Sequence, residues 1–230
     1  MRAINPPINA KTSDIRHVSG RICIAPQQRL SLTSASDFKT YIRTPLPMDQ
    51  KLLTLLHFNL VRALNENVLM LGLDPGAMSD DLESPFFCNE SGEGLELVQK
   101  LPPTLRPTEI QRSIKHHPEI DVFPFPKYRD NLIMAGDKVD DVELCVDLLY
   151  GVDLHEDVAG KRRSCHDGPY GTAGRTGMII WSEPWMESSW EVDEGFARKY
   201  RGLLEGCEEL IRSTNFWREK RGEGPLVLDD

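Results

Sequence analysis

The sequence lacks the patterns that mark metal-bound, disulfide-bonded and membrane-spanning proteins. Its five cysteines are odd in number and widely spaced, and no two of them form a CxxC pair. This usage argues against a zinc ribbon or a disulfide framework and favours free thiols in a reduced compartment. No apolar run approaches the ~20 residues that span a bilayer, and the N-terminus has no apolar signal segment. We therefore expect a soluble intracellular protein, in the nucleus or the cytoplasm.

Catalytic signatures are missing as well. There is no GxSxG motif, and no set of nucleophile, base and oxyanion donors can be assembled from the sequence. The glycine-rich segment 168–176 differs from a phosphate-binding loop, because its spacing is one residue too long and Arg175 replaces the lysine. We expect no enzyme activity and no cofactor.

Basic residues are not clustered. Residues 1–47 carry a net charge of +5, scattered along the segment, and residues 48–230 carry a net charge of −14. An acidic body repels the phosphate backbone, so we expect no direct nucleic-acid binding.

Strand signals are nearly absent, which predicts an all-α or predominantly α protein. Residues 1–47 show no sustained periodicity and are predicted to form a flexible tail. Residues 48–230 then form a single helical domain with long irregular connectors rich in proline and tryptophan. Residues 160–177, which are polar and glycine-rich, are predicted to be an exposed insertion, and the acidic segment 73–100 is predicted to be a loop.

The longest predicted helix covers residues 48–70. Apolar residues cover most of its sides, which predicts a helix buried in the middle of a bundle. A leucine zipper through Leu53 and Leu60, or through Leu56, Ala63 and Met70, is the sharper alternative. We favour the core helix, because the heptad pattern lasts only about three heptads.

The segment 101–131 is the centre of the domain. Thr108 and Gln111 fit a capping box, which predicts a short helix over residues 107–116. Pro118 ends it, and the prolines among the following apolar residues predict a rigid, buried connector that includes Phe123 and Phe125. Pro126 then begins another helix, with Gly136 just past its end.

Further elements follow from caps and periodicity. Asp140 with Glu143 marks a helix start, and Gly151 marks its end. Residues 178–181 are predicted to form a short strand, and Asp193 with Glu194 begins the next helix. The side chains predicted to face inward from these helices and from a last one are Val142, Cys145, Val146, Leu149, Phe196, Tyr200, Leu203, Leu204, Leu210, Ile211 and Trp217.

Several polar and aromatic residues of the connectors have two interpretations. His116 and His117 resemble metal ligands, but adjacent helical side chains diverge by about 100°, so we expect no metal. Asp121 and Arg129, together with Asp130, are predicted to fix a turn by hydrogen bonds and ion pairs. Core packing is the favoured role of the tryptophans, although they are also suited to lining a ligand pocket.

Four sequence segments resemble those of a known family. They are LLHFNLVRALNEN at 55–67, LPPTLRPTEIQRSIKHHPEIDVFPFPKYRDNLI at 101–133, IIWSEPWMESSWEV at 179–192 and TNFWREKRGEGPL at 214–226. Together they resemble the fungal domain of unknown function found in the C-terminal part of bZIP-type transcription factors. The sequence departs from that pattern at Glu119, Ser182 and Glu183. The residues before the first helix also lack the run of arginine and lysine that a basic zipper needs.

The resemblance implies a regulatory, protein-interaction domain in transcription that lacks its own DNA-binding element. Its expected partner is a protein, with a bZIP factor as one candidate. The alternatives are a helical sensor of an apolar small molecule, with a pocket near Trp185, Trp190 and His117, and an uncharacterised enzyme. The candidate residues for binding a partner or ligand are His116, His117, Asp121, Arg129, Trp185 and Trp190.

Overall fold

The structure is a computed structural model, and it describes residues 48–78, 82–87, 95–152 and 176–228. The predicted tail at 1–47 lies outside these residues, as does the predicted glycine-rich insertion up to residue 175.

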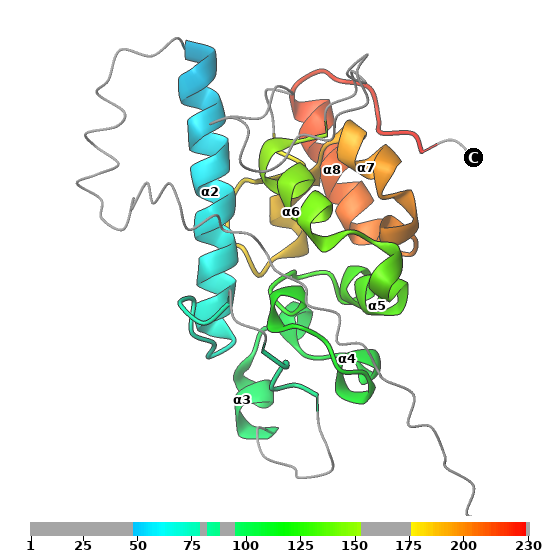
Figure 1. The fold of residues 1–230 in the computed structure, drawn as a ribbon. Coiled ribbons are helices and arrows are strands. Elements are labelled where there is room, and N and C mark those ends of the chain that lie inside the picture. Colours follow the sequence, from blue (N-terminus) through cyan, green and yellow to red (C-terminus); the bar gives the residue numbers. More distant parts are fainter. Residues whose placement is uncertain (1–47, 79–81, 88–94, 153–175, 229–230) are drawn as a thin grey trace, which may run out of the picture.

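The described part of the chain is predominantly helical, as predicted (Figure 1). It contains seven α-helices, five short 3₁₀ helices and one two-stranded sheet. No helix among these residues is both long and apolar enough to cross a bilayer. The elements are α2 (Met48–Met70), α3 (Leu95–Lys100), η1 (Pro103–Leu105), α4 (Glu109–Ser113), η2 (Pro118–Ile120), α5 (Pro126–Ala135), η3 (Gly136–Lys138), α6 (Asp141–Tyr150), β1 (Met178–Ile180), η4 (Glu187–Ser189), β2 (Trp190–Val192), α7 (Glu194–Lys199), η5 (Arg201–Leu204) and α8 (Glu208–Lys220).

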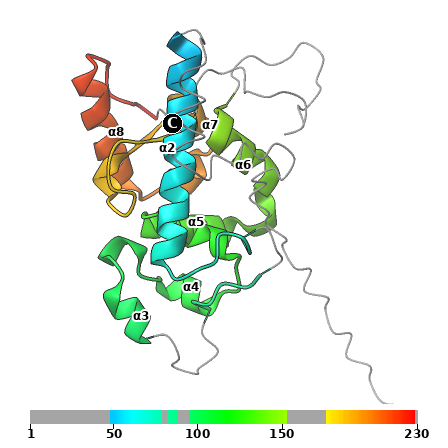
Figure 2. The same ribbon diagram turned by 90° about the vertical axis from the view of Figure 1, so that its left-hand side faces the viewer.

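Helix α2 has the predicted bounds but not the predicted surroundings. Leu60 and Ala63 are fully buried, which confirms the core interpretation for two positions of the proposed zipper. However, Leu52, Leu55 and Leu69 are 56%, 40% and 62% exposed, so the prediction of a helix buried on most sides is wrong. The reason is that α2 runs along one side of the domain, which covers only one of its faces (Figures 1 and 2).

The capping box of the central segment is present. The Gln111 backbone N–H donates to the Thr108 side chain, and the Thr108 backbone N–H donates to the Gln111 side chain. The resulting helix, α4, covers only Glu109–Ser113, so the predicted span of 107–116 is too long at both ends. Pro107 lies before the cap rather than in the first turn, and Ile114 is already extended.

The proline-rich connector after α4 is buried, as predicted. Val122, Phe123 and Phe125 are almost completely inaccessible. Helix α5 begins at Pro126 and ends at Gly136, which adopts a φ of 50° that favours glycine. The apolar side chains of the connector belong to the hydrophobic core, and α5 packs against α4 and η5.

Two other sequence predictions need correction. Helix α6 is capped by Asp140, whose side chain accepts from the Glu143 N–H, as predicted, but Val142 points outward and is 44% exposed. Helix α6 has more apolar residues than its inward face can hold, so Val142 is left exposed to solvent. The segment 73–100, predicted as a loop, contains helix α3 at its end.

Strands β1 and β2 link the two ends of the domain. They pair antiparallel, with Met178 opposite Val192 and Ile180 opposite Trp190. Strand β1 packs on α2, and β2 packs on α8. The sheet therefore joins the first and last helices of the described chain through a core that includes Trp190.

Gly177 corrects the predicted end of the insertion and gives a testable prediction. It is buried rather than exposed, and a Cβ there would lie 2.5 Å from both the Asp147 carbonyl oxygen and the Phe196 ring. We expect Gly177→Ala to lower the free energy of unfolding by ~1–3 kcal/mol, because the backbone has to move. Gly202→Ala, where the new Cβ has open space, is the control and should change it by no more than about 0.5 kcal/mol in a urea titration. Equal effects of the two substitutions would contradict the close approach at Gly177.

Candidate functional site

A buried guanidinium joins α5 to the residues around η1 and α4. Arg129, on α5, is fully buried and donates to the carbonyl oxygens of Thr104 at 2.7 Å and of Arg106 at 2.8 Å. It also donates to the Phe123 carbonyl and to the side chain of Gln111. Burial lowers the pKa of Arg129 to about 10, partly opposed by the negative charge of Asp121, so the group stays cationic at neutral pH. Through these hydrogen bonds, Arg129 holds the connector at Phe123 close to Thr104 and Arg106, which precede α4.

A buried carboxylate completes the network. Asp121 is 1% exposed and accepts from Gln111, from the Ser84 hydroxyl at 2.6 Å and from His116 Nε2 at 2.9 Å. The other ring nitrogen of His116 lies 2.7 Å from the Ile114 carbonyl oxygen.

The candidate residues predicted from the sequence fall into three places. His116, Asp121 and Arg129 share the network, linked through Gln111. His117 points away from it, towards Glu119 at 3.3 Å.

The two candidate tryptophans lie elsewhere in the domain. Trp190 is fully buried, and its ring meets Phe125 edge-on at 5.8 Å. Trp185 is half-buried, and its backbone carbonyl accepts from the Thr104 hydroxyl.

The network at Arg129 has the properties of a structural centre. Its polar atoms bond to one another or to backbone carbonyls, so the hydrogen bonds predicted for Asp121 and Arg129 are present. Among the described residues, no group of three or more potential metal ligands is present. The binding role of these residues, and of His117 and the two tryptophans, stays a prediction.

An exposed aromatic cluster lies at another place on the surface. Trp181, which follows β1, stacks on Trp217 of α8 with ring centroids 5.0 Å apart. Phe216 meets Trp217 edge-on at 5.2 Å. Trp181 and Phe216 are 40% and 48% exposed. We call these three residues the aromatic face.

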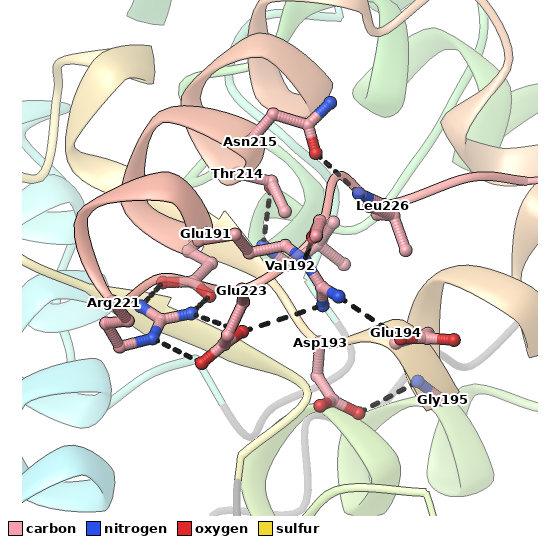
Figure 3. A network of polar contacts seen from close by, with 12 residues as sticks. Glu191, Val192, Asp193, Glu194, Gly195, Thr214, Asn215, Arg221, Glu223 and Leu226 are labelled. Atoms are coloured by element: carbon pink, nitrogen blue, oxygen red, sulfur yellow. Dashed lines mark hydrogen bonds and ion pairs between the residues drawn. The ribbon is translucent and has the colours of Figure 1, made fainter.

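Hydrogen bonds hold the rings of the aromatic face in place. The Trp181 indole N–H donates to Glu191, and the Trp217 indole N–H donates to the Ser188 carbonyl. The buried Glu191 side chain also binds both ends of the Arg221 guanidinium (Figure 3). Arg221 lies 5.8 Å from the Trp181 ring, so the ring is fixed by its N–H on one side and by a cation over its face.

The C-terminal segment is tied to the same region (Figure 3). The Leu226 N–H donates to the Asn215 side chain at 2.7 Å, and the Val192 N–H donates to the Thr214 hydroxyl at 3.0 Å. Arg218 donates to the Gly224 carbonyl. The Thr214 bond holds α8 against β2, and the other two bonds hold the C-terminal segment on α8, so the surroundings of the aromatic face are ordered.

The sequence contained signals for the aromatic face that were not used. In the strand, Met178 and Ile180 face inward, so the two-residue period places Trp181 outward. Phe216 and Trp217 are adjacent on a helix, so both cannot point into the core. Trp217, predicted to face inward, is half-buried and lies between the core and the surface.

Cys207 gives a prediction on thiol reactivity. Burial raises the pKa of its thiol to about 12, with a further rise from Glu208. Because the thiolate is the nucleophile, we expect Cys207 in the folded protein to alkylate at least ~100-fold more slowly at pH 8 than in the urea-unfolded protein. Its folded pKa exceeds its unfolded pKa, so its contribution to stability is present below pH 9 and is lost as the pH rises towards 12. Mass spectrometry of the alkylated peptides checks the rate, and a rate equal to that of the unfolded protein would contradict the buried position.

The fold defines a predominantly helical domain with a small sheet at its centre. A family model described as a domain of unknown function (DUF3425) matches residues 94–211, which is just over half of the chain. The chain therefore belongs to the DUF3425 family. No curated protein and no solved structure matches it. The matched segment contains Trp181 and the buried network except for Ser84, whereas α2 and the other two residues of the aromatic face lie outside it.

Proposed function

We propose that this protein is a non-catalytic protein-interaction domain that acts in transcription regulation, and that its aromatic face binds the partner. The observation that carries the proposal is the exposure of a rigid aromatic cluster, Trp181, Phe216 and Trp217, in which both indole N–H groups are satisfied internally. Tryptophan and phenylalanine are enriched at protein interfaces, and tryptophan is a frequent hot spot. Rings that are already fixed lose little conformational entropy on binding.

The charge of the domain favours a basic partner. Residues 48–230 carry a net charge of −14, which steers cationic proteins towards the domain. The rings of the aromatic face already accommodate cations, since Lys220 lies 5.2 Å from the Phe216 ring and Arg221 lies over Trp181. An arginine or lysine of the partner would have to replace Lys220 at the Phe216 ring to make such a cation–π contact.

The sequence resemblance supplies the finer proposal, a bZIP-type transcription factor as the partner. The positive charge of such a factor attracts an acidic domain, and binding outside the residues that contact DNA would place this domain on the DNA that the factor reads. The buried candidate residues His116, Asp121 and Arg129 then act by holding the domain in shape.

The partner proposal is tested with purified proteins. We expect bZIP-type factors from the same organism to bind the domain in isothermal titration calorimetry. Phe216→Ala should weaken binding at least ~10-fold, because truncation of an aromatic hot spot removes about 2 kcal/mol or more. Met134→Ala, at a more exposed apolar residue on α5, is the control and should bind like the unmodified protein. Absence of binding would overturn the bZIP proposal, and binding that is insensitive to Phe216→Ala would overturn the role of the aromatic face.

The domain alone should not bind duplex DNA specifically. Specific recognition needs side chains delivered to a groove and cations on the phosphates, whereas the body is acidic and the basic residues of 1–47 are dispersed. We expect fluorescence anisotropy with random and promoter duplexes to show no sequence-dependent binding at ~150 mM salt. Sub-micromolar, sequence-dependent binding there would contradict the proposal that a partner reads the DNA.

A further inference from the structure

The outward face of α2 carries a regular stripe of side chains. It consists of positions 52, 55, 59, 62, 66 and 69, which alternate in steps of three and four residues as the two core positions of a heptad repeat do. All six side chains are exposed or half-buried. The stripe lies opposite the buried Leu60, Ala63 and Leu64, on the side of the helix that the domain does not cover (Figures 1 and 2). We call these six residues the outer stripe: Leu52, Leu55, Asn59, Arg62, Glu66 and Leu69.

The outer stripe is apolar at its ends and polar in its middle. Leu52 and Leu55 lie at one end, and Leu69 lies at the other. In the middle, Arg62 and Glu66 form an ion pair at 2.5 Å one turn apart. Exposed leucines in heptad spacing have a large apolar area in water, which favours a helical partner.

We infer that this stripe pairs with the same stripe of a second copy of the protein, in antiparallel orientation. In an antiparallel pair of helices, each position meets the one at the same distance from the opposite end of the stripe. Leu52 then faces Leu69 of the second copy, and Asn59 faces Arg62. Leu55 faces Glu66, whose methylene groups can cover it. All six positions find a partner in one register, as two-fold symmetry requires.

Charge selects the antiparallel orientation over the parallel one. A parallel pair would bring Arg62 against Arg62 and Glu66 against Glu66, and such like-charge contacts are unfavourable. In the antiparallel pair the Asn59 amide oxygen can accept from the guanidinium of Arg62 in the second copy. Each Arg62 also keeps its own Glu66, so no unpaired charges meet at the two-fold axis. The polar middle therefore fixes the register, and the leucines at the ends supply the apolar contact.

The stripe is short, about 26 Å at 1.5 Å per residue, so the association should be weak. We expect sedimentation equilibrium to show an apparent mass that rises from 26.1 kDa towards twice that value between ~5 and ~500 μM protein. Leu69→Lys should weaken the association at least ~10-fold, because it places a charge opposite Leu52. Leu82→Lys, at an exposed leucine outside α2, is the matched control and should leave it unchanged. A constant mass of 26.1 kDa over this range, or equal behaviour of the two variants, would overturn the proposal.

Cysteine cross-linking tests the orientation directly. Under mild oxidation, a mixture of the Leu52→Cys and Leu69→Cys variants should form a disulfide between positions 52 and 69, identified by mass spectrometry of the linked peptide. The Leu52→Cys variant alone should not link to itself through that position. Self-linking at position 52 without mixed linking would show a parallel pair and overturn the proposal. Phe216→Ala should still self-associate, which separates this inference from the proposed role of the aromatic face.

Discussion

Replacing Arg129 by methionine is expected to lower the free energy of unfolding by ~3–5 kcal/mol, among the largest effects of any single substitution in this domain. The methionine keeps part of the side-chain volume but removes every donor. The carbonyl oxygens of Thr104, Arg106 and Phe123 then lose a buried hydrogen bond, and the negative charge of Asp121 loses a nearby cation. Chemical denaturation followed by circular dichroism measures the change.

Two further variants separate the hydrogen bonds of Arg129 from its charge. Arg129→Lys keeps the cation but lacks the planar fork that reaches several carbonyls, so we expect it to restore only a minor part of the loss. Arg212→Met, at a side chain that is 70% exposed and forms a surface ion pair with Glu209, should change stability by no more than about 0.5 kcal/mol. Full rescue by lysine would mean that charge, rather than geometry, is what the site requires.

Replacing Phe125 by alanine is expected to lower the free energy of unfolding by ~3–5 kcal/mol as well. The ring is almost completely buried and meets Trp190 edge-on, so its removal leaves a cavity beside the largest buried side chain. Pro124 and Pro126 hold the backbone on both sides, which limits collapse into that cavity.

Phe216→Ala is the matched control for Phe125→Ala. It removes the same ring from a position that is 48% exposed, so we expect a change of no more than about 1 kcal/mol. Urea denaturation of both variants gives the comparison. A small effect at Phe125 would mean that the connector tolerates loss of its aromatic packing.

The local elements were predictable because their signals lie within a few residues. The capping box of Thr108 and Gln111, the helix end at Gly136 and the cap at Asp140 each depend on side chains that contact the backbone nearby. The bounds of α2 were predictable from another local signal, because its apolar period is uninterrupted.

The surroundings of those elements were not predictable, because they depend on distant segments. The buried Asn67 of α2 shows this: its side chain donates to the carbonyl oxygens of Val122 and Pro184, far along the sequence. Which face of α2 is covered follows from such contacts. The exposure of Leu69 could not be inferred from the helix alone.

The candidate site was predictable in part. The sequence indicated that Asp121 and Arg129 fix a turn, and the structure adds that Gln111 joins them. The aromatic face was missed because its residues come from two segments, and only the fold brings Trp181 against Trp217.

The position of the sheet has a consequence for how the folding unit is delimited. Strand β1 rests on α2, which precedes the family segment at 94–211, and β2 rests on α8, which that segment cuts after Ile211. A fragment limited to 94–211 would lose the hydrogen bonds from Asn67 to two buried carbonyls and the ring that covers Trp181. The unit that packs as one folded piece is therefore larger than the segment that the family model matches. Alignments of family members should be extended to residues 48–226 before variable positions are interpreted.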